Sequence, residues 1–462
     1  QFATARIKRL YQRYSGMNRK YVLYLALLAG LLTGCYNEED SREHVLKVYN
    51  WADYIGEGVL EDFQQYYKEQ TGEEIRIVYQ TFDINEIMLT KIEKGHEDFD
   101  VVCPSEYIIE RMLRKDLLLP IDTVFAHSPN YMNGVAPYIR EQIDKLGTPD
   151  NPASRYAVCY MWGTAGLLYN RAYVSESDLK SWGCLWEKRF AGKILMKDAY
   201  RDAYGMALLY ARRRDLAEGR VTVPELMNDY SPASMDSVEK YLKLLKPNVA
   251  GWEADFGKEM MTKGKAWMNM TWSGDAQWAI EEARTVGVEL AYTVPEEGSN
   301  IWYDGWVIPK FARNRKAASY FINFLCRPDI ALRNMEANGY VSSIAAPEIM
   351  EACIDTTLTE PVDASYFFGP DAKAVKLRNT QYPDRSVVAR CAMIRDFGDR
   401  TVDVLEIWSR VKGDNLNGSI VALILVVAGL LCIWQIRRRW MAYKRRNLHR
   451  KRRRRQRRKP GC

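Results

Sequence analysis

Acidic residues close to tryptophans are the most informative chemical pattern in this sequence. Three such pairs occur at separate places along the chain: Trp51 with Asp53, Trp272 with Asp275, and Trp302 with Asp304. A carboxylate pairs with an organic ammonium group, and an indole face attracts a cation by roughly 0.5–2 kcal/mol while packing against methylene groups. Burying an ammonium group without an anion is unfavourable, so a site for such a cation needs both features. The pattern predicts a site for an organic cation whose charges lie at separated points.

The distribution of charge agrees with this prediction. Residues 1–34 hold six Lys and Arg and residues 437–462 hold fifteen, with no acid in either segment, so the whole-chain formal charge of +7 leaves −14 for residues 35–436. An acidic body attracts cationic solutes and repels nucleic acid. We therefore expect no nucleic-acid partner for the body of the chain.

The motifs of familiar enzymes are missing from the sequence. Only four histidines occur, too scattered for a histidine-based metal site or triad, and no GxSxG, HExxH, CxxC, GxGxxG or GxxxxGK[ST] pattern is present. We expect no catalytic residue, cofactor or metal. The enzyme alternative takes Asp202, Asp275 and Asp304 as general acid and base carboxylates of a glycosidase, which a turnover assay on oligosaccharides would test.

The start of the chain has the form of an export signal. The basic segment 17–20 precedes an apolar run over 21–32 and then Thr33-Gly34-Cys35. Residues 32–35 resemble the bacterial lipobox, in which the cysteine is lipidated after cleavage, and a plain signal peptide with a chance cysteine is the alternative. We interpret residues 1–34 as upstream residues plus a lipoprotein signal peptide. The mature protein would begin at Cys35, anchored outside the cytoplasmic membrane.

The end of the chain also points to a membrane. Residues 418–436 are nearly all apolar, about the minimum length for a transmembrane helix, and residues 437–462 form a polybasic tail that the positive-inside tendency places in the cytoplasm. The alternative is a disordered basic tail of no specific role.

Between these ends, strand and helix patterns alternate with short connections. Residues 46–51, 75–79, 99–104, 156–169 and 193–196 have the pattern of strands. Helical spacing occurs over 59–71, 85–94, 182–188, 204–213, 237–245 and 316–325. This rhythm predicts two α/β lobes with a cleft between them, and ligands of such sheets bind at the carboxyl ends of strands. The six cysteines of the body are expected to be mostly buried small hydrophobic residues, with any disulfide pairing left open.

The order of motifs over residues 46–412 resembles the periplasmic spermidine/putrescine-binding proteins of bacterial ABC importers. The matching motifs are VYNWADY (48–54), NE (85–86), DVVCPSEY (100–107), YMWGT (160–164), TWSGD (271–275), WYD (302–304), NFLCRPD (323–329) and GY (339–340). The resemblance implies a type II-like, two-lobed solute-binding fold that closes on a polyamine by hinge motion. We assign residues 46–153 and 303–350 to the first lobe and residues 154–302 and 351–412 to the second.

The same resemblance implies roles for particular residues. The implied ligand-binding set is Trp51, Asp53, Tyr54, Ser105, Tyr107, Asp202, Trp272, Asp275, Trp302, Asp304 and Tyr340. Asp304 is the carboxylate expected near the centre of the cleft, and Asp275 matches members that bind putrescine, which favours a diamine. Ser105 is equally compatible with a helix N-cap, and Asp202 with a surface loop. Ala52 stands where the family usually has a hydroxyl side chain, so one polar contact is missing.

The implied function is capture of putrescine or spermidine outside the cytoplasm and delivery to a membrane permease driven by a separate ATPase. Two alternatives keep the fold. One is a binding protein for another small solute, such as an amino acid, sugar or ferric ion; the other is a membrane-anchored polyamine receptor whose tail signals. Amino-acid binders need an arginine and iron binders favour clustered Tyr and His, whereas the predicted cleft supplies mainly acids.

Overall fold

The computed structural model describes residues 42–254 and 256–413, together with the single positions 426, 429, 434, 435, 437 and 438. The predicted signal peptide over 1–34 and the lipidation site Cys35 lie outside the described residues. So do most of the apolar segment 418–436 and of the tail 437–462. Within the described part of the chain, no helix has the length and apolar character that crossing a bilayer requires.

The first third of the described chain alternates strands and helices, as its sequence pattern predicts. In order, the elements are β1 (Val45–Trp51), α3 (Val59–Thr71), β2 (Arg76–Phe82), α4 (Asn85–Glu93), β3 (Val101–Val102) and α5 (Glu106–Arg114). Helix α3 buries one face, including Phe63 and Tyr67. It ends at Gly72, whose φ of 76° is left-handed and whose backbone N–H donates to the carbonyl of Lys68.

A second alternation of strands and helices follows the long strand over 157–170. It comprises β6 (Ile194–Lys197), α7 (Tyr200–Ala211), α10 (Pro232–Leu245), β7 (Val249–Glu253), β8 (Met268–Trp272) and α12 (Ser273–Thr285). The other helices are α6 (Pro137–Asp144), α8 (Arg213–Ala217), α9 (Val223–Met227), α11 (Gly257–Thr262), α13 (Arg315–Leu325), α14 (Pro328–Asn338), α15 (Pro347–Cys353), α16 (Ser365–Phe368), α17 (Arg385–Ala389) and α18 (Thr401–Gly413).

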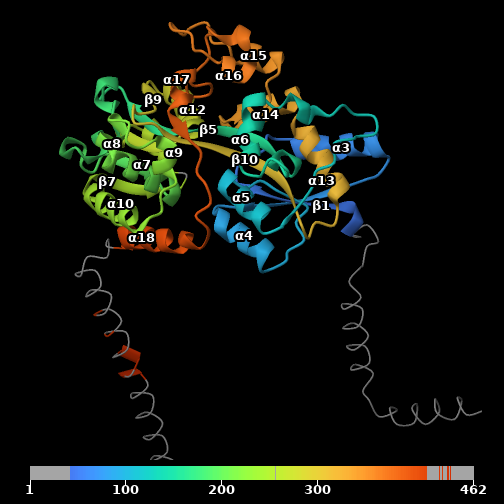
Figure 1. Ribbon diagram of the computed structural model, residues 1–462, viewed down its shortest axis with the longest axis horizontal. Coiled ribbons are helices and arrows are strands. Elements are labelled where there is room, and N and C mark those ends of the chain that lie inside the picture. The colour runs from blue at the N-terminus through green and yellow to red at the C-terminus, as the bar shows by residue number, and fades with distance from the viewer. Residues whose placement is uncertain are drawn as a thin grey trace, which may run out of the picture.

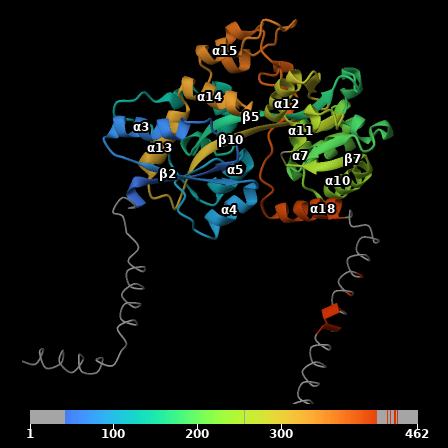
Figure 2. The ribbon, with the colours of Figure 1, turned by 180° about the vertical axis from the view of Figure 1, so that it is seen from behind.

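Two long buried strands connect the halves of the molecule. The strand path runs β2-β1-β3-β10-β5-β8-β6-β7, with β5 (Ala157–Asn170) and β10 (Ser299–Pro309) antiparallel to each other at its centre. Short strands β4 (Leu118–Leu119), β9 (Leu290–Thr293), β11 (Val341–Ser342) and β12 (Cys391–Ala392) pair with these two. Figure 1 shows β5 and β10 running from the lobe that contains β1 toward the lobe that contains β7, and Figure 2 shows the same from behind.

The buried side chains form two large cores, one per lobe. The first contains residues from 46–162 and 301–388, and the second contains residues from 165–270 and 392–411. A smaller cluster lies beneath α12. The proposed lobe boundaries differ from this distribution over 157–162, 301–302 and 351–388, because buried side chains of these segments, such as Trp162, Phe367 and Tyr382, join the first core. Helix α18, at the end of the segment 351–412, packs on α10 and α7 of the second lobe, as the proposed boundary expects.

Two local expectations from the sequence need correction. The strand expected over 99–104 is reduced to Val101–Val102, since Pro104 cannot donate to a sheet and Ser105 already leads into α5. The helix expected over 182–188 is two short 3₁₀ turns, where Gly183 disfavours a helix interior and the Trp182 Nε1 donates to the carbonyl of Gly298.

The six cysteines of the body are free thiols. Cys103, Cys159, Cys184 and Cys326 are buried, while Cys353 and Cys391 are partly buried. The interpretation as mostly buried small hydrophobic residues is confirmed.

Candidate functional site

Asp304 lies where β10 passes between the two lobes. The ladder between β10 and β5 shifts register at Asp304/Gly305, and such irregularities re-aim side chains. The Asp304 carboxylate is 8% exposed and accepts a hydrogen bond from Tyr54 Oη at 2.8 Å and another from Ser105 Oγ at 2.7 Å. Ser105 does hold the N-cap position of α5, but its hydroxyl is directed to Asp304 rather than to the helix.

The two donors that reach Asp304 are neutral hydroxyls in a buried setting. Burial raises the pKa of Asp304 to about 6, against the two hydroxyl hydrogen bonds, which lower it, and the nearby negative charge of Asp202 adds to the rise. A carboxylate in this setting gains most from a cation that comes within hydrogen-bonding distance.

Asp202 lies in the first turn of α7, just after β6. Helix N-termini favour negative charge, and this carboxylate is buried at 8% exposure. It accepts hydrogen bonds from Asn300 Nδ2 at 2.8 Å and from Trp272 Nε1 at 3.2 Å. Burial raises its pKa, while these two hydrogen bonds and the positive charges of Arg201 and Lys197 act in the opposite direction. The surface-loop alternative is therefore wrong for Asp202.

Asp275 lies in the first turn of α12, which follows β8 directly. One of its oxygens accepts a hydrogen bond from Tyr340 Oη at 2.8 Å, and the other lies 2.5 Å from Lys197 Nζ. A second lysine, Lys258, has its Nζ 3.8 Å from Asp275. Burial acts to raise the pKa of Asp275, but the charges of the two lysines outweigh burial, and the pKa is lowered.

Aromatic rings separate these carboxylates. The ring centroid of Tyr340 lies 5.5 Å from that of Tyr54 and 5.4 Å from that of Trp302, both in edge-on arrangements. Gly274, in the TWSGD motif, leaves room for the Tyr340 ring, since a Cβ at that position would lie 2.2 Å from Tyr340 Cδ1. The glycine is required because the Tyr340 ring lies directly against its backbone.

A second polar network lies beside the carboxylates; it contains the predicted residue Tyr107, but Glu86 and Tyr200 were not predicted as site residues. Tyr107 Oη accepts from Asn85 Nδ2 at 3.2 Å and donates to Glu86 Oε1 at 3.0 Å. Tyr200 Oη, from the second lobe, donates to the same Glu86 oxygen at 2.6 Å. The NE motif at 85–86 was the available signal for this network, whereas nothing in the sequence pointed to Tyr200.

Lys197 also lies in the candidate site and was not predicted from the sequence. It ends strand β6 after three buried apolar residues and is only 1% exposed. The available signal was a lysine that continues an apolar strand a few residues before Asp202.

Trp51 and Asp53 lie apart from the hydrogen-bonded carboxylates. Trp51 is partly buried, and its ring packs against Phe82 with centroids 4.5 Å apart. Asp53 is exposed, with a φ of 52° in the left-handed region. The structure thus leaves Trp51 and Asp53 outside the cluster. It brings together Tyr54, Ser105, Tyr107, Asp202, Trp272, Asp275, Trp302, Asp304 and Tyr340.

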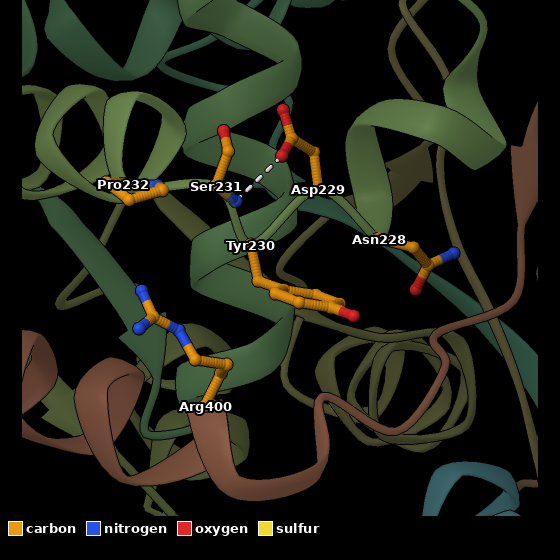
Figure 3. Close-up of a pocket in the computed structure, with 6 residues that line it drawn as sticks. All are labelled: Asn228, Asp229, Tyr230, Ser231, Pro232 and Arg400. Carbon is orange, nitrogen blue, oxygen red and sulfur yellow. Dashed lines mark hydrogen bonds between the residues drawn. The ribbon is translucent and has the colours of Figure 1, made fainter.

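The assembled residues come from both lobes. Tyr340 packs on the first core and donates across to Asp275 of the second lobe, while Trp272 packs against both cores. A surface pocket of about 520 Å³ lies elsewhere, on the second lobe, and Asn228, Asp229, Tyr230, Ser231, Pro232 and Arg400 line it (Figure 3). None of the predicted site residues lines this pocket. The candidate site is accordingly the interlobe contact, in a closed arrangement.

A two-lobed α/β fold with a carboxylate and aromatic cluster between the lobes defines a solute-binding protein. The sequence profile of the bacterial extracellular solute-binding protein family matches residues 62–348, and the chain belongs to this family.

Particular relatives narrow the comparison. The spermidine/putrescine-binding periplasmic protein of Escherichia coli K12 is 30% identical over 363 residues, which cover 78% of this chain and 92% of that protein. The putrescine-binding periplasmic protein of the same strain is 27% identical over 329 residues, 68% of this chain and 82% of that one. A solved spermidine/putrescine ABC transporter substrate-binding protein of Streptococcus pneumoniae is 29% identical with a TM-score of 0.58, covering 80% of this chain and 98% of that one.

Proposed function

We propose that this protein is the extracytoplasmic polyamine-binding subunit of an ABC importer, capturing putrescine or spermidine between its lobes. The observation that carries the proposal is the gathering of Asp202, Asp275 and Asp304, all buried, around aromatic rings at the lobe interface. The family and the named ligands of the relatives support the same solute class.

The chemistry of a polyamine fits this arrangement. Its ammonium groups need carboxylates that lack a cation, and its methylenes need apolar walls between the charges. Asp304 and Asp202 receive hydrogen bonds from neutral donors, and each carboxylate oxygen retains a further lone pair for an ammonium group. Tyr54, Tyr340 and Trp302 supply rings beside Asp304.

Ligand binding and lobe closure are then one event. Asp304 lies on a strand shared by both lobes, Ser105 belongs to the first lobe, and Asp202 belongs to the second. A ligand held by groups of both lobes favours the closed state by its differential affinity for that state. The closed form docks on a membrane permease, and a separate ATPase drives import. The role is binding rather than catalysis.

Attachment to a membrane is a further part of the proposal. The lipobox-like segment ending at Cys35 supports lipid anchoring at the extracytoplasmic face, and the apolar segment 418–436 with its basic tail supports an additional span. Cell fractionation with Cys35→Ser, with truncation after Gly413, and with both changes together separates the two anchors. Release of the protein by Cys35→Ser alone would refute the C-terminal span. Retention of the doubly changed protein would refute both anchors.

Calorimetric titration with putrescine, spermidine, an amino acid and a sugar tests the function. We expect polyamine dissociation constants of micromolar or tighter, about −8 kcal/mol or better. Asp304→Asn should weaken polyamine binding by at least about 100-fold, since loss of a buried charge partner costs about 3–5 kcal/mol. The exposed Asp150→Asn is the matched control and should leave affinity unchanged. Binding of the sugar or amino acid in place of polyamines would refute the proposal.

A further inference from the structure

Lys197 provides an ammonium group from within the protein at the candidate site. Its Nζ lies 2.5 Å from Asp275 Oδ2 and 3.5 Å from Glu253 Oε1. The same Nζ lies 4.6 Å from the centroid of the Trp272 ring. The side chain is 2% exposed, so this ammonium is held among protein groups rather than in solvent.

These surroundings are the ones a ligand ammonium would require. A carboxylate pairs with the charge and an indole face covers it. Tyr340 Oη donates a hydrogen bond to the other oxygen of Asp275 at 2.8 Å, so both oxygens of this carboxylate have partners inside the chain. Asp304 and Asp202 differ, because their hydrogen-bond donors are hydroxyl, amide and indole groups without charge. The charges of Arg201 and Lys197 act on Asp202 from nearby and oppose the rise of its pKa that burial causes, but neither side chain donates a hydrogen bond to it.

We propose that Lys197 is a specificity-determining residue that restricts the ligand to two ammonium groups, one for Asp304 and one for Asp202. This inference rests on the proposed polyamine function. A third ammonium directed toward Asp275 meets the like charge of Lys197, and opposing like charges in an interface cost several kcal/mol. The protein therefore selects a diamine over a triamine through its own lysine.

The position of Trp272 links Lys197 to the open carboxylates. The face of this ring lies under the Lys197 ammonium, while its Nε1 donates to Asp202. Lys197 thus contacts a side chain that itself holds a proposed ligand carboxylate. A lysine with a purely structural role would not change the ratio of affinities for a triamine and a diamine, and that ratio is the quantity to measure.

The experiment compares putrescine and spermidine by calorimetry on the wild-type protein and three variants. The variants are Lys197→Met, the double change Lys197→Met with Asp275→Asn, and Lys193→Met as a matched control. Lys193 precedes the same strand, and its ammonium lies 5.3 Å from the ring centroid of Trp267. Thermal unfolding of each ligand-free variant establishes that it is folded.

We expect the wild-type protein to bind putrescine more tightly than spermidine. Lys197→Met should shift the affinity ratio toward spermidine by at least about tenfold, equivalent to about 1.4 kcal/mol, because Asp275 then loses the lysine at 2.5 Å and keeps only Lys258 at 3.8 Å. The double variant should shift it less, at least about threefold, because the repulsion is removed without leaving a free carboxylate. Lys193→Met should not shift it. If Lys197→Met does not fold, the double variant carries the test.

Three results would overturn the inference. A wild-type preference for spermidine contradicts it, and so does an unchanged ratio in the folded Lys197 variants while polyamines still bind. An equal shift in Lys193→Met would show a general effect of lost charge. Absence of all polyamine binding by the wild-type protein would instead refute the proposed function, and this inference with it.

Discussion

Replacing Gly274 by alanine tests whether the interlobe contact is the closed state of a binding site. An alanine Cβ would lie 2.2, 2.3 and 2.5 Å from three atoms of the Tyr340 ring, well inside van der Waals contact. The ring belongs to the first lobe and Gly274 to α12 of the second, so the methyl group forces the lobes apart. Overpacking of this kind costs about 1–3 kcal/mol.

The same substitution should not weaken the fold of the second lobe. Gly274 is the second residue of helix α12 and its φ is not left-handed, so alanine fits the local backbone without strain. The penalty therefore falls on closure, and ligand affinity should drop by about 5-fold to 150-fold. The unfolding temperature of the ligand-free protein should stay the same or rise.

Calorimetry with putrescine and thermal unfolding of the ligand-free protein measure the two effects. Gly413→Ala is the control, because its Cβ would meet nothing within 4 Å at the end of α18. An unchanged dissociation constant in Gly274→Ala would refute the argument, since it would mean that the Tyr340 contact does not belong to the ligand-bound state. A large fall in unfolding temperature would show that the contact serves the fold instead.

Two further predictions concern titration and the interlobe network. Because burial raises the pKa of Asp304 to about 6, the folded protein holds a proton there that the unfolded chain releases near pH 4, so stability falls as pH rises from about 4 to about 6. At pH 7 the free energy of unfolding of Asp304→Asn should therefore exceed that of the wild type by up to about 3 kcal/mol, seen as a higher unfolding temperature, and at pH 4 the difference should be gone. The same unfolding temperature for variant and wild type at both pH values would contradict this. Tyr200→Phe removes the hydrogen bond to Glu86 between the lobes and should weaken putrescine binding by about 5- to 10-fold, with no effect counting against a role in closure.

Local sequence patterns predicted the elements that position the site because each pattern is a property of a short segment. The helix over 59–71 and the strand over 46–51 follow from periodic apolar residues that must face a core. Asp202 and Asp275 lie in the first turns of α7 and α12, but the helix expected over 204–213 starts after Asp202 and no helix was expected over 273–285. The grouping of these acids with Asp304 is a geometric result that the structure supplies.

Pairing between distant segments could not be predicted in the same way. Lys197 and Asp275 are 78 positions apart, and their contact depends on β6 lying beside β8 in the sheet. The sequence shows a lysine at the end of an apolar strand but not which carboxylate it meets. Asp53 illustrates the converse, since it is close to Tyr54 in sequence yet exposed, because the turn directs only Tyr54 inward.

The ion pair between Lys197 and Asp275 changes how the TWSGD motif is interpreted, because the sequence alone suggests that Asp275 binds the ligand. An acid near a tryptophan in a binding family implies a ligand charge only where the chain supplies no cation of its own. At Asp275 the nearer cation is Lys197 of β6, with Lys258 of α11 further away, whereas at Asp304 the donors are hydroxyls. Two acids with the same family match can therefore differ in function, one accepting an ammonium from solution and the other holding a lysine that sets how many such groups fit. The number of ligand charges follows from the balance of charge within the closed interface rather than from the number of acids in the motifs.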